Sequence, residues 1–339
     1  MKILSVESSC DETAVAVVED GRTVLTDCIA SQVALHRLYG GVVPEIASRK
    51  HTEAIVPTVM DAMEQAGARW ADLSAVAVTQ GPGLVGALVV GLAFAKGLCF
   101  ATGLPLIGVN HLEGHLYANR YVAPDLEAPF IALLVSGGHT MLVHVRDWGD
   151  YEVLGSTLDD AVGEAFDKVA KALGLGYPGG PIISRFAAQG DPRAIDFPRA
   201  MMHSGDLRFS LSGLKTAVVT YINKKNAAGE PVDIPDLAAS FQAAVVDVQV
   251  HKAWQACKET GCRTLCMGGG VASNPALRAA LSDHLGRRGV RVVMPDAHAC
   301  TDNATMIASC AVDLFAEGLM CGLDADVIAH MPLRSKDAG

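Results

Sequence analysis

The chain opens with two apolar, β-branched runs at residues 2–7 and 14–19, which a polar turn separates. Short runs of this kind joined by a turn predict a β-hairpin. The same unit returns in the second half, where the runs 130–135 and 141–145 flank a turn of small residues. A repeated unit of strand, turn and strand predicts two related α/β domains, with chance similarity of two hairpins as the alternative.

Apolar residues at helical spacing and short buried runs predict the remaining elements. The expected helices lie at 52–66, 84–94, 161–173 and 237–254, from 276 onward and up to about 315, and the expected strands at 75–79, 106–109, 264–267 and 290–294. Residues 190–212 have no clear period and are predicted to form an insertion or long loop.

The most apolar run, residues 84–95, spans 12 residues before Lys96 interrupts it. A bilayer needs roughly 20 apolar residues, so this run predicts a buried helix. The N-terminal residues reach Glu7 and Asp11 without the apolar core of a signal peptide, and we expect a cytoplasmic protein with no membrane association.

Two domains whose opening hairpins face a shared cleft are the layout of the actin, Hsp70 and sugar-kinase superfamily, called ASKHA. The expected fold is therefore α/β, with two related ASKHA domains around a central cleft. We assign residues 1–110 plus 300–339 to the first domain and 111–299 to the second.

Composition narrows the class of protein. Half of the 339 residues are hydrophobic and 19% are charged, as in a compact globular chain. The nine cysteines include no CxxC pair, so we expect buried thiols without disulfides. A net charge of −10 disfavours nucleic-acid binding unless basic residues cluster. Arg208, Lys215, Lys224 and Lys225 form a loose cluster, for which a solvated helix face is the alternative.

The segment 109–117 carries His111 and His115, four residues apart. On a helix this spacing places both imidazoles on one face, within reach of one metal ion. Two surface or hydrogen-bonded histidines are the alternative. In the common zinc peptidases a glutamate base directly follows the first histidine, but here Leu112 follows, and Glu113 points away from the histidine face.

Several polar residues are candidates for chemistry, each with an ordinary alternative. Asp302 precedes a helix, where it would cap the N-terminus or serve as a third metal ligand. Asp11 and Glu12 lie in the first hairpin turn, either as turn acids or as acids that act on bound water, phosphate or a nucleophile. Asp167 is either a solvated helix residue or a partner for a substrate hydroxyl or amine.

Two loops rich in small residues could receive a substrate. The turn 136–138 is either a plain hairpin turn or a loop whose amides meet an acyl or phosphoryl group. His139 beside it is expected to form a hydrogen bond within the turn rather than bind metal. The glycines at 268–270 connect a strand to a helix start, where a backbone can approach a nucleotide closely.

Five ordered motifs together resemble the bacterial TsaD family, formerly called Gcp. They are the histidine pair and residues 136–140, 179–181, 268–274 and 300–303, and the similarity extends from residue 1 to about 330. The resemblance implies transfer of threonylcarbamoyl from threonylcarbamoyl-AMP to N6 of adenosine 37, in tRNAs that read codons starting with A, forming t6A and AMP. It also implies the ASKHA fold and one divalent metal ion, iron or zinc, with Fe²⁺ favoured.

The resemblance also assigns residues. It implies that His111, His115 and Asp302 hold the metal, and that Asp11 and Glu12 are catalytic candidates. The adenylate site would be formed by Leu134, Val135, Ser136, Gly137, Gly138, Asp167, Gly180 and Asn274. Two positions depart from the family pattern: Ser273 stands where many members have Ala, and residues 330–333 read His-Met-Pro-Leu instead of the usual Arg-Trp-Pro-Leu.

The implied partners are tRNA, threonylcarbamoyl-AMP made by a TsaC-like protein, and TsaB-like and TsaE-like proteins, with a homodimer possible without them. Three rival functions remain: a metallopeptidase, disfavoured by the missing glutamate after His111; a sugar or acetate kinase, disfavoured by the histidines; and a non-enzymatic scaffold like TsaB, which generally lacks the histidine pair.

Overall fold

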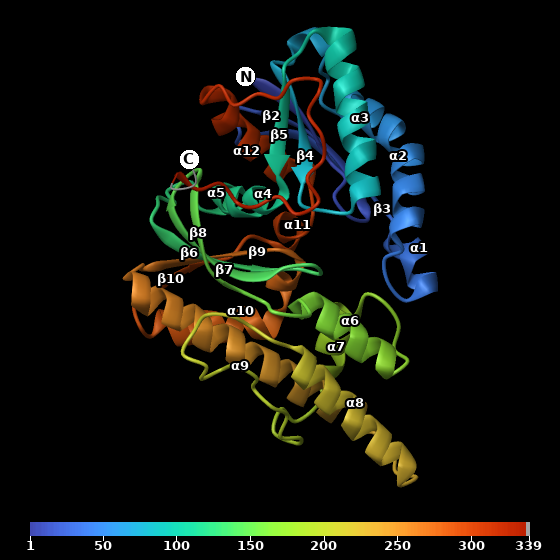
Figure 1. Cartoon of the computed structure of the whole chain (residues 1–339), viewed down its shortest axis with the longest axis vertical. Coiled ribbons are helices and arrows are strands. Elements are labelled where there is room, and N and C mark those ends of the chain that lie inside the picture. The colour runs from blue at the N-terminus through green and yellow to red at the C-terminus, as the bar shows by residue number, and fades with distance from the viewer. Residues whose placement is uncertain (337–339) are drawn as a thin grey trace. The chain divides into compact units, whose positions relative to one another are not determined.

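The structure, a computed structural model, describes residues 1–336, which form two compact units (Figure 1). Unit 1 comprises Met1–Asp125 and Thr301–Leu333, and unit 2 comprises Leu126–Cys300 and the described residues from Arg334 on. The sequence predicts a boundary after residue 110, whereas residues 111–125 belong to unit 1. The reason is that helix α4 (His111–Tyr117) packs against helix α12 (Ala304–Ala316) of the same unit.

Unit 1 is built on a five-stranded sheet with the strand order β3-β2-β1-β4-β5. Strands β1, β2 and β3 pair antiparallel, and β1, β4 and β5 pair parallel. The strands are β1 (Lys2–Glu7), β2 (Glu12–Glu19), β3 (Thr23–Ser31), β4 (Ala75–Gly81) and β5 (Leu106–Asn110). The carboxyl ends of β4 and β5 therefore lie at one edge, where an α/β sheet usually binds ligands.

Helices cover both faces of this sheet. Figure 1 shows α2 (Pro44–Gln65) and α3 (Val85–Thr102) side by side along it, and α12 packs on the opposite face of β1. Side chains alternate along a strand, so Leu4 and Val6 join the core beneath α2 and α3. Ser5 points the other way and donates a hydrogen bond to Ala304 O of α12 at 2.7 Å.

Four short helices complete unit 1: α1 (Val33–His36), η1 (Arg37–Tyr39), η2 (Trp70–Asp72) and α5 (Asn119–Val122).

Helix α3 buries one stripe rather than its whole surface. Leu88, Leu92 and Ala95 are buried against the sheet, whereas Val89 and Phe100 are exposed. The sequence predicts a buried helix, and this is wrong for one face of α3. One face of the helix packs on the sheet, and the opposite face is exposed to solvent. By length and composition α3 is the one described helix able to cross a membrane, a test that core helices of soluble proteins also pass.

This one-sided burial leads to a stability prediction. Leu92→Ala should lower the free energy of unfolding by about 2–5 kcal/mol, because it opens a cavity beneath α3. Leu92 is 3% exposed, and Val89, 45% exposed on the same helix, supplies the matched control. Val89→Ala should change stability by less than about 0.5 kcal/mol, as measured by urea unfolding. Equal losses in the two variants would contradict the described packing.

Unit 2 repeats the architecture of unit 1. Its sheet has the order β10-β9-β6-β7-β8, in which β6, β7 and β8 pair antiparallel and β6, β9 and β10 pair parallel. The strands are β6 (Phe130–Val135), β7 (Thr140–Asp147), β8 (Asp150–Ser156), β9 (Thr264–Gly268) and β10 (Arg291–Val293). In chain order the five strands occupy the same places in both sheets, which confirms the predicted fold class of two related ASKHA-type α/β domains.

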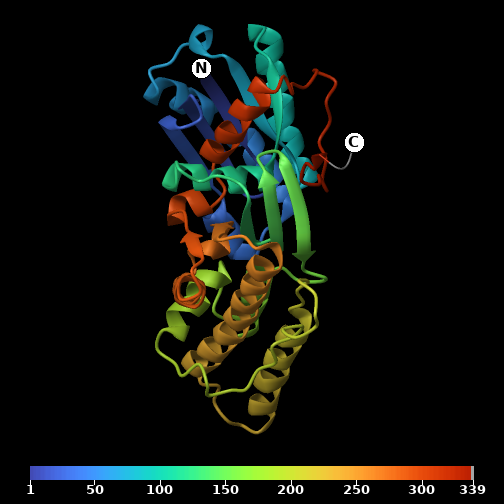
Figure 2. The same ribbon diagram turned by 90° about the vertical axis from the view of Figure 1, so that its left-hand side faces the viewer.

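The helices of unit 2 share one large core with its sheet. They are α6 (Val162–Ala172), α7 (Gly179–Ala187), α8 (Ser212–Ala227), α9 (Ile234–Thr260), η3 (Gly270–Ser273), α10 (Pro275–Gly286) and α11 (Ala297–Cys300). Figure 2 shows the long helices α8 and α9 alongside one another. Between α7 and α8 the chain forms only turns and one isolated β-bridge, as predicted for a long loop.

All nine cysteines are free thiols, which confirms the expectation of no disulfides. Cys10, Cys28 and Cys321 are partly exposed, so burial is not complete.

Candidate functional site

Strand β5 leads directly into the helix that carries the two histidines. The side chain of Asn110 caps α4 by accepting hydrogen bonds from the backbone N–H groups of Leu112 and Glu113. His111 and His115 follow one turn apart, at 5% and 1% exposure, with ring centroids 4.7 Å apart. The predicted helical spacing therefore places both imidazoles on one buried face. Glu113 lies off that face, where the thiol of Cys310 faces its carboxylate.

Asp302 completes a cluster with the two histidines. Its Oδ1 lies 3.6 Å from His111 Nε2 and 3.3 Å from His115 Nε2, and one ligand atom from each residue lies within 4.8 Å of the others. Two ligands bound to one ion at roughly 2.1 Å lie about 3.0–3.4 Å apart at ordinary coordination angles. The 3.3 Å separation lies within this range and the 3.6 Å separation slightly exceeds it, so small movements of the side chains would let all three ligands reach one cation.

The hydrogen bonding of His115 also fits a metal ligand. This ring is almost completely buried, yet neither of its nitrogens has a hydrogen-bond partner among the described residues. An unsatisfied buried polar atom is costly, and a bound cation would satisfy Nε2. The nitrogen, nitrogen and oxygen donor set suits zinc or iron.

A buried carboxylate orients the other histidine. His111 Nδ1 lies 2.9 Å from Glu7 Oε2, and Ser9 Oγ lies 3.2 Å from the same nitrogen. Glu7 also accepts hydrogen bonds from Thr79 Oγ1, at 2.6 Å, and from the backbone N–H of Ser9. A carboxylate on one ring nitrogen directs the other nitrogen toward a metal, so Glu7 supports His111 from behind.

Charge pairing keeps a proton on His111 in the metal-free chain. Burial lowers the pKa of His111, but attraction to Glu7 and Asp302 outweighs it and raises the pKa to about 9. Burial likewise raises the pKa of Glu7, but attraction to His111 and hydrogen bonds leave it lowered. A metal ion bound at Nε2 would therefore displace a proton.

Asp302 does not cap the following helix. Asn303 is the N-cap of α12, since its Oδ1 accepts a hydrogen bond from the backbone N–H of Met306. The capping role considered for Asp302 is therefore wrong, and its carboxylate faces the histidines instead.

Asp11 and Glu12 lie at the start of β2, where several polar contacts hold their turn. Glu12 Oε1 accepts a hydrogen bond from Ser31 Oγ at 2.8 Å, and the backbone carbonyl of Cys10 lies 2.9 Å from Nε2 of His51, which is buried. Burial, followed by the charge of Asp11, raises the pKa of Glu12 to about 9. Glu12 is therefore protonated at neutral pH in the metal-free chain.

This raised pKa predicts a pH dependence of stability. The stabilisation from neutral Glu12 is complete below its unfolded pKa of about 4.5 and is lost as pH rises through about 9. Glu12→Gln should therefore unfold at a higher temperature than the parent in chelator-treated protein, by a margin that grows from pH 6 to pH 9. A margin that stays constant with pH would contradict the proton assignment.

In unit 2 five of the candidate substrate residues, 134–138, follow one another at the end of β6. Leu134 and Val135 are buried in the strand, and Ser136 begins a turn in which its Oγ accepts a hydrogen bond from the backbone N–H of His139. The backbone N–H of Gly163, at the start of α6, donates to Ser136 O. Gly137 and Gly138 have open space where a side chain would stand, so the turn can admit a ligand.

The remaining candidates take part in helix contacts. Asp167 on α6 accepts a hydrogen bond at 2.6 Å from the backbone N–H of Gly179, and Gly180 follows in the first turn of α7 with open space at its Cβ position. Asn274 caps α10 by accepting from Leu277 N, and its Nδ2 donates to Gln242 Oε1 at 2.8 Å. Asp167 and Asn274 therefore also hold the local structure.

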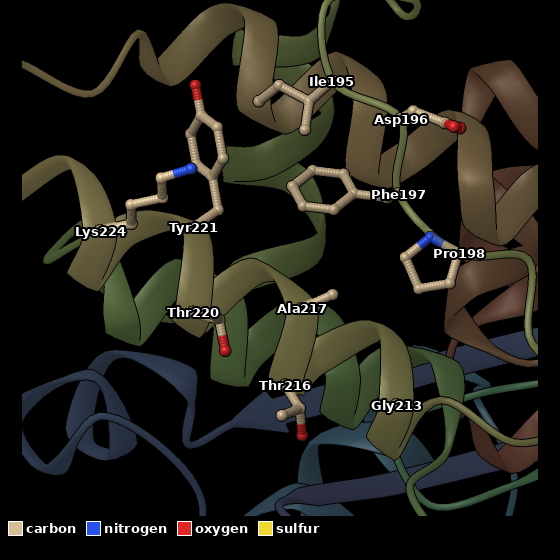
Figure 3. Close-up of a pocket in the computed structure, with 10 residues that line it drawn as sticks. All are labelled: Ile195, Asp196, Phe197, Pro198, Gly213, Thr216, Ala217, Thr220, Tyr221 and Lys224. Atoms are coloured by element: carbon tan, nitrogen blue, oxygen red, sulfur yellow. The ribbon is translucent and has the colours of Figure 1, made fainter.

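A hollow of about 470 Å³ lies elsewhere in unit 2, between residues 195–198 and α8 (Figure 3). In Figure 3, Phe197 and Pro198 on the loop face Tyr221 and Ala217 on the helix. The hollow contains none of the predicted site residues.

The basic cluster near α8 is largely neutralised. Lys215 pairs with Asp160, Lys225 with Glu230 and Arg208 with Asp206, each within 2.7 Å. The solvated helix face considered as an alternative therefore describes these residues better than an open basic patch, and the structure adds that they are ion-paired.

Sequence reasoning missed Glu7 and Asn110, which support the histidine helix. The available signals were a charged residue that ends the apolar strand β1 and an N-cap residue type directly before His111.

Comparison with known proteins identifies the family of the chain. A family model described as TsaD, tRNA N6-adenosine threonylcarbamoyltransferase, matches residues 23–309. A Clostridium botulinum protein with that enzyme name is 52% identical over 333 residues, covering 98% of each chain. A Clostridium perfringens protein of the same name is 54% identical over 309 residues, covering 91% of each chain.

Among solved structures, HypF from T. kodakarensis is similar in fold, with a TM-score of 0.65 and 14% sequence identity. The match covers 94% of this chain and 48% of the HypF chain. At this identity the likeness concerns the fold alone. The family model and the clostridial relatives, which cover nearly the whole sequence, show that the chain belongs to the TsaD family of enzymes, the tRNA N6-adenosine threonylcarbamoyltransferases.

Proposed function

We propose that the chain transfers threonylcarbamoyl from threonylcarbamoyl-AMP to N6 of adenosine 37, in tRNAs that read codons starting with A, forming t6A and AMP. The main support is the cluster of the buried His111 and His115 with the partly exposed Asp302, in a chain whose family carries out tRNA threonylcarbamoylation. Glu7 behind His111 supports a metal-binding role for this cluster.

In this proposal His111, His115 and Asp302 hold one divalent metal ion, iron or zinc. We favour Fe²⁺, which two imidazoles and one carboxylate suit with coordination positions left open. The bound ion would supply Lewis-acid stabilisation of negative charge on the threonylcarbamoyl-adenylate. The contribution of the chain is to fix the three ligands and to exclude water around the buried histidines.

The residues of unit 2 bind the donor. The backbone amides of Leu134–Gly138 would receive its polar groups, with Gly137 and Gly138 leaving room for a close approach. Asp167, Gly180 and Asn274 would complete the donor site, because their helix contacts fix them in place before the substrate binds.

The transfer itself requires a proton acceptor. The N6 amine, weakened as a nucleophile by conjugation with the purine, attacks the carbamoyl carbon. The new N–C bond forms as the C–O bond to AMP breaks, and AMP leaves with the bonding electron pair. We assign the amine proton to Asp11 or Glu12. Asp11 is favoured, since Glu12 already holds a proton in the metal-free chain at neutral pH.

We further propose that the protein acts in the cytoplasm, away from membranes, with TsaB-like and TsaE-like partners. The net charge of −10 and the paired basic residues of α8 support a need for partners in tRNA binding.

The decisive experiment supplies threonylcarbamoyl-AMP, unmodified tRNA and the partner proteins, and detects t6A by mass spectrometry of the digested tRNA. A tRNA with guanosine at position 37 is the matched control and should stay unmodified. Absence of t6A with metal-loaded protein would reject the proposed reaction, and modification of the control would reject the proposed position.

A further inference from the structure

The end of unit 1, residues 321–333, runs along β5 and β4 from the start of β5 to the edge where both strands end, and we call it the strap. Cys321 forms an antiparallel bridge with Leu106 of β5, and its N–H donates to Leu106 O at 2.8 Å. Gln80 of β4 accepts a backbone hydrogen bond from Ile328, and its Nε2 donates to Asp326 O at 2.7 Å. The strap is therefore anchored at several points before it reaches α4.

Contact between the strap and β4 is close enough to require glycine. A Cβ atom on Gly81 would lie 1.9 Å from Ile328 O. Gly83, two residues after the end of β4, donates its N–H to Ala329 O at 3.2 Å. Backbone therefore packs on backbone here, which leaves the strap little freedom to shift.

Asn110 joins this strap to the helix of the two histidines. Its Nδ2 donates to Pro332 O at 2.8 Å and to Met331 O at 3.4 Å, while its Oδ1 caps α4 through Leu112 and Glu113. Asn110 is 2% exposed, and both the nitrogen and the oxygen of its buried amide form hydrogen bonds. His111 is the next residue in the chain.

We propose that Asn110 is a positioning residue of the metal site, through which the strap fixes the start of α4 and hence the direction of His111. This inference rests on the proposed metal-binding role of His111, His115 and Asp302. The strap contributes backbone carbonyls, so the contact is kept although residues 330 and 331 depart from the family's usual Arg-Trp.

Asn110→Asp separates this role from simple helix capping. Aspartate caps a helix as well as asparagine does, but it would set an oxygen against the two strap carbonyls. An added negative charge near a cation site should strengthen cation binding. Positioning by the strap predicts the opposite sign: a loss of about tenfold or more in metal affinity, as typical for groups that orient ligands.

The experiment measures Zn²⁺ affinity of the purified full chain by competition with a chromophoric chelator. Asn223→Asp, on an exposed turn of α8, carries the same charge change and should bind Zn²⁺ like the parent. Gln80→Glu replaces the Nε2 donor to Asp326 O with an oxygen and so loosens the strap at β4 rather than at α4. This variant should also weaken Zn²⁺ binding, by about threefold or more. Circular dichroism and thermal unfolding of the metal-free proteins check that each variant is folded.

Weaker binding in both Asn110→Asp and Gln80→Glu supports the inference. Unchanged or tighter Zn²⁺ binding by a folded Asn110→Asp variant overturns the inference. If Asn110→Asp does not fold, unchanged Zn²⁺ affinity in Gln80→Glu overturns the inference instead. A parent chain that binds Zn²⁺ no better than its His111→Ala variant would overturn the metal role itself, and this inference with it. The experiment measures Zn²⁺ binding and not threonylcarbamoyl transfer, so its result does not depend on whether the proposed reaction is correct.

Discussion

Replacement of His111 with alanine is expected to abolish metal binding and tRNA modification together. Groups that only orient a metal ligand are worth about 10–100-fold in affinity, so removal of a ligand should cost at least about 100-fold. The effect is large here because Glu7 and Asp302 would be left as buried or half-buried carboxylates without the imidazole between them. Zn²⁺ or Fe²⁺ content after dialysis and t6A formation are measured on the same preparation.

His284→Ala, on α10 of unit 2, is the matched control and should keep both metal and activity, since this histidine lies outside the cluster. Asp302→Asn tests the third ligand with little change in volume and should lower metal content as well. Full transfer by a metal-free His111→Ala protein would refute the proposed role of the ion. Loss of transfer with normal metal content would assign His111 to another role.

Hydrophobic patterning predicted every strand except β3 and β8, which lie at the antiparallel edge of each sheet. β1 and β6 coincide with the predicted runs 2–7 and 130–135, because their nearly uniform burial produces continuous apolar sequence. β3 and β8 were not predicted. Each lies at the edge of its sheet with many exposed positions, so polar residues interrupt the apolar pattern.

The parts of the candidate site that depend on residues close together in the sequence were predictable. The spacing of His111 and His115 follows from helix geometry and was visible in the sequence. For Asp302 the sequence left helix capping and metal binding open, and the family resemblance favoured metal binding. The pairing of Glu7 with His111 joins residues 104 positions apart, and no local pattern encodes it. Asp302 and Asn303 are both capping residue types, and only packing decides that Asn303 caps α12.

The second large effect is expected at Gly269, which supports the proposed donor loop. Gly269 has φ +88° and ψ 155°, a region essentially restricted to glycine. A Cβ atom there would lie 2.4 Å from Val135 O and 3.1 Å from Ser136 Cβ. Gly269→Ala should therefore displace the turn after β6 and lower kcat/KM for threonylcarbamoyl-AMP by about 100-fold, since every 1.4 kcal/mol of lost binding is tenfold.

Gly286→Ala, at the end of α10, is the matched control, because its backbone conformation is ordinary and its Cβ position is open. Transfer rates at varied donor concentration separate the two variants, and Zn²⁺ content reports on unit 1 independently. Because the metal ligands belong to unit 1, Gly269→Ala should keep its metal while losing donor affinity. An unchanged kcat/KM in that variant would mean that the turn after β6 does not bind the donor, even if the histidine cluster holds its ion.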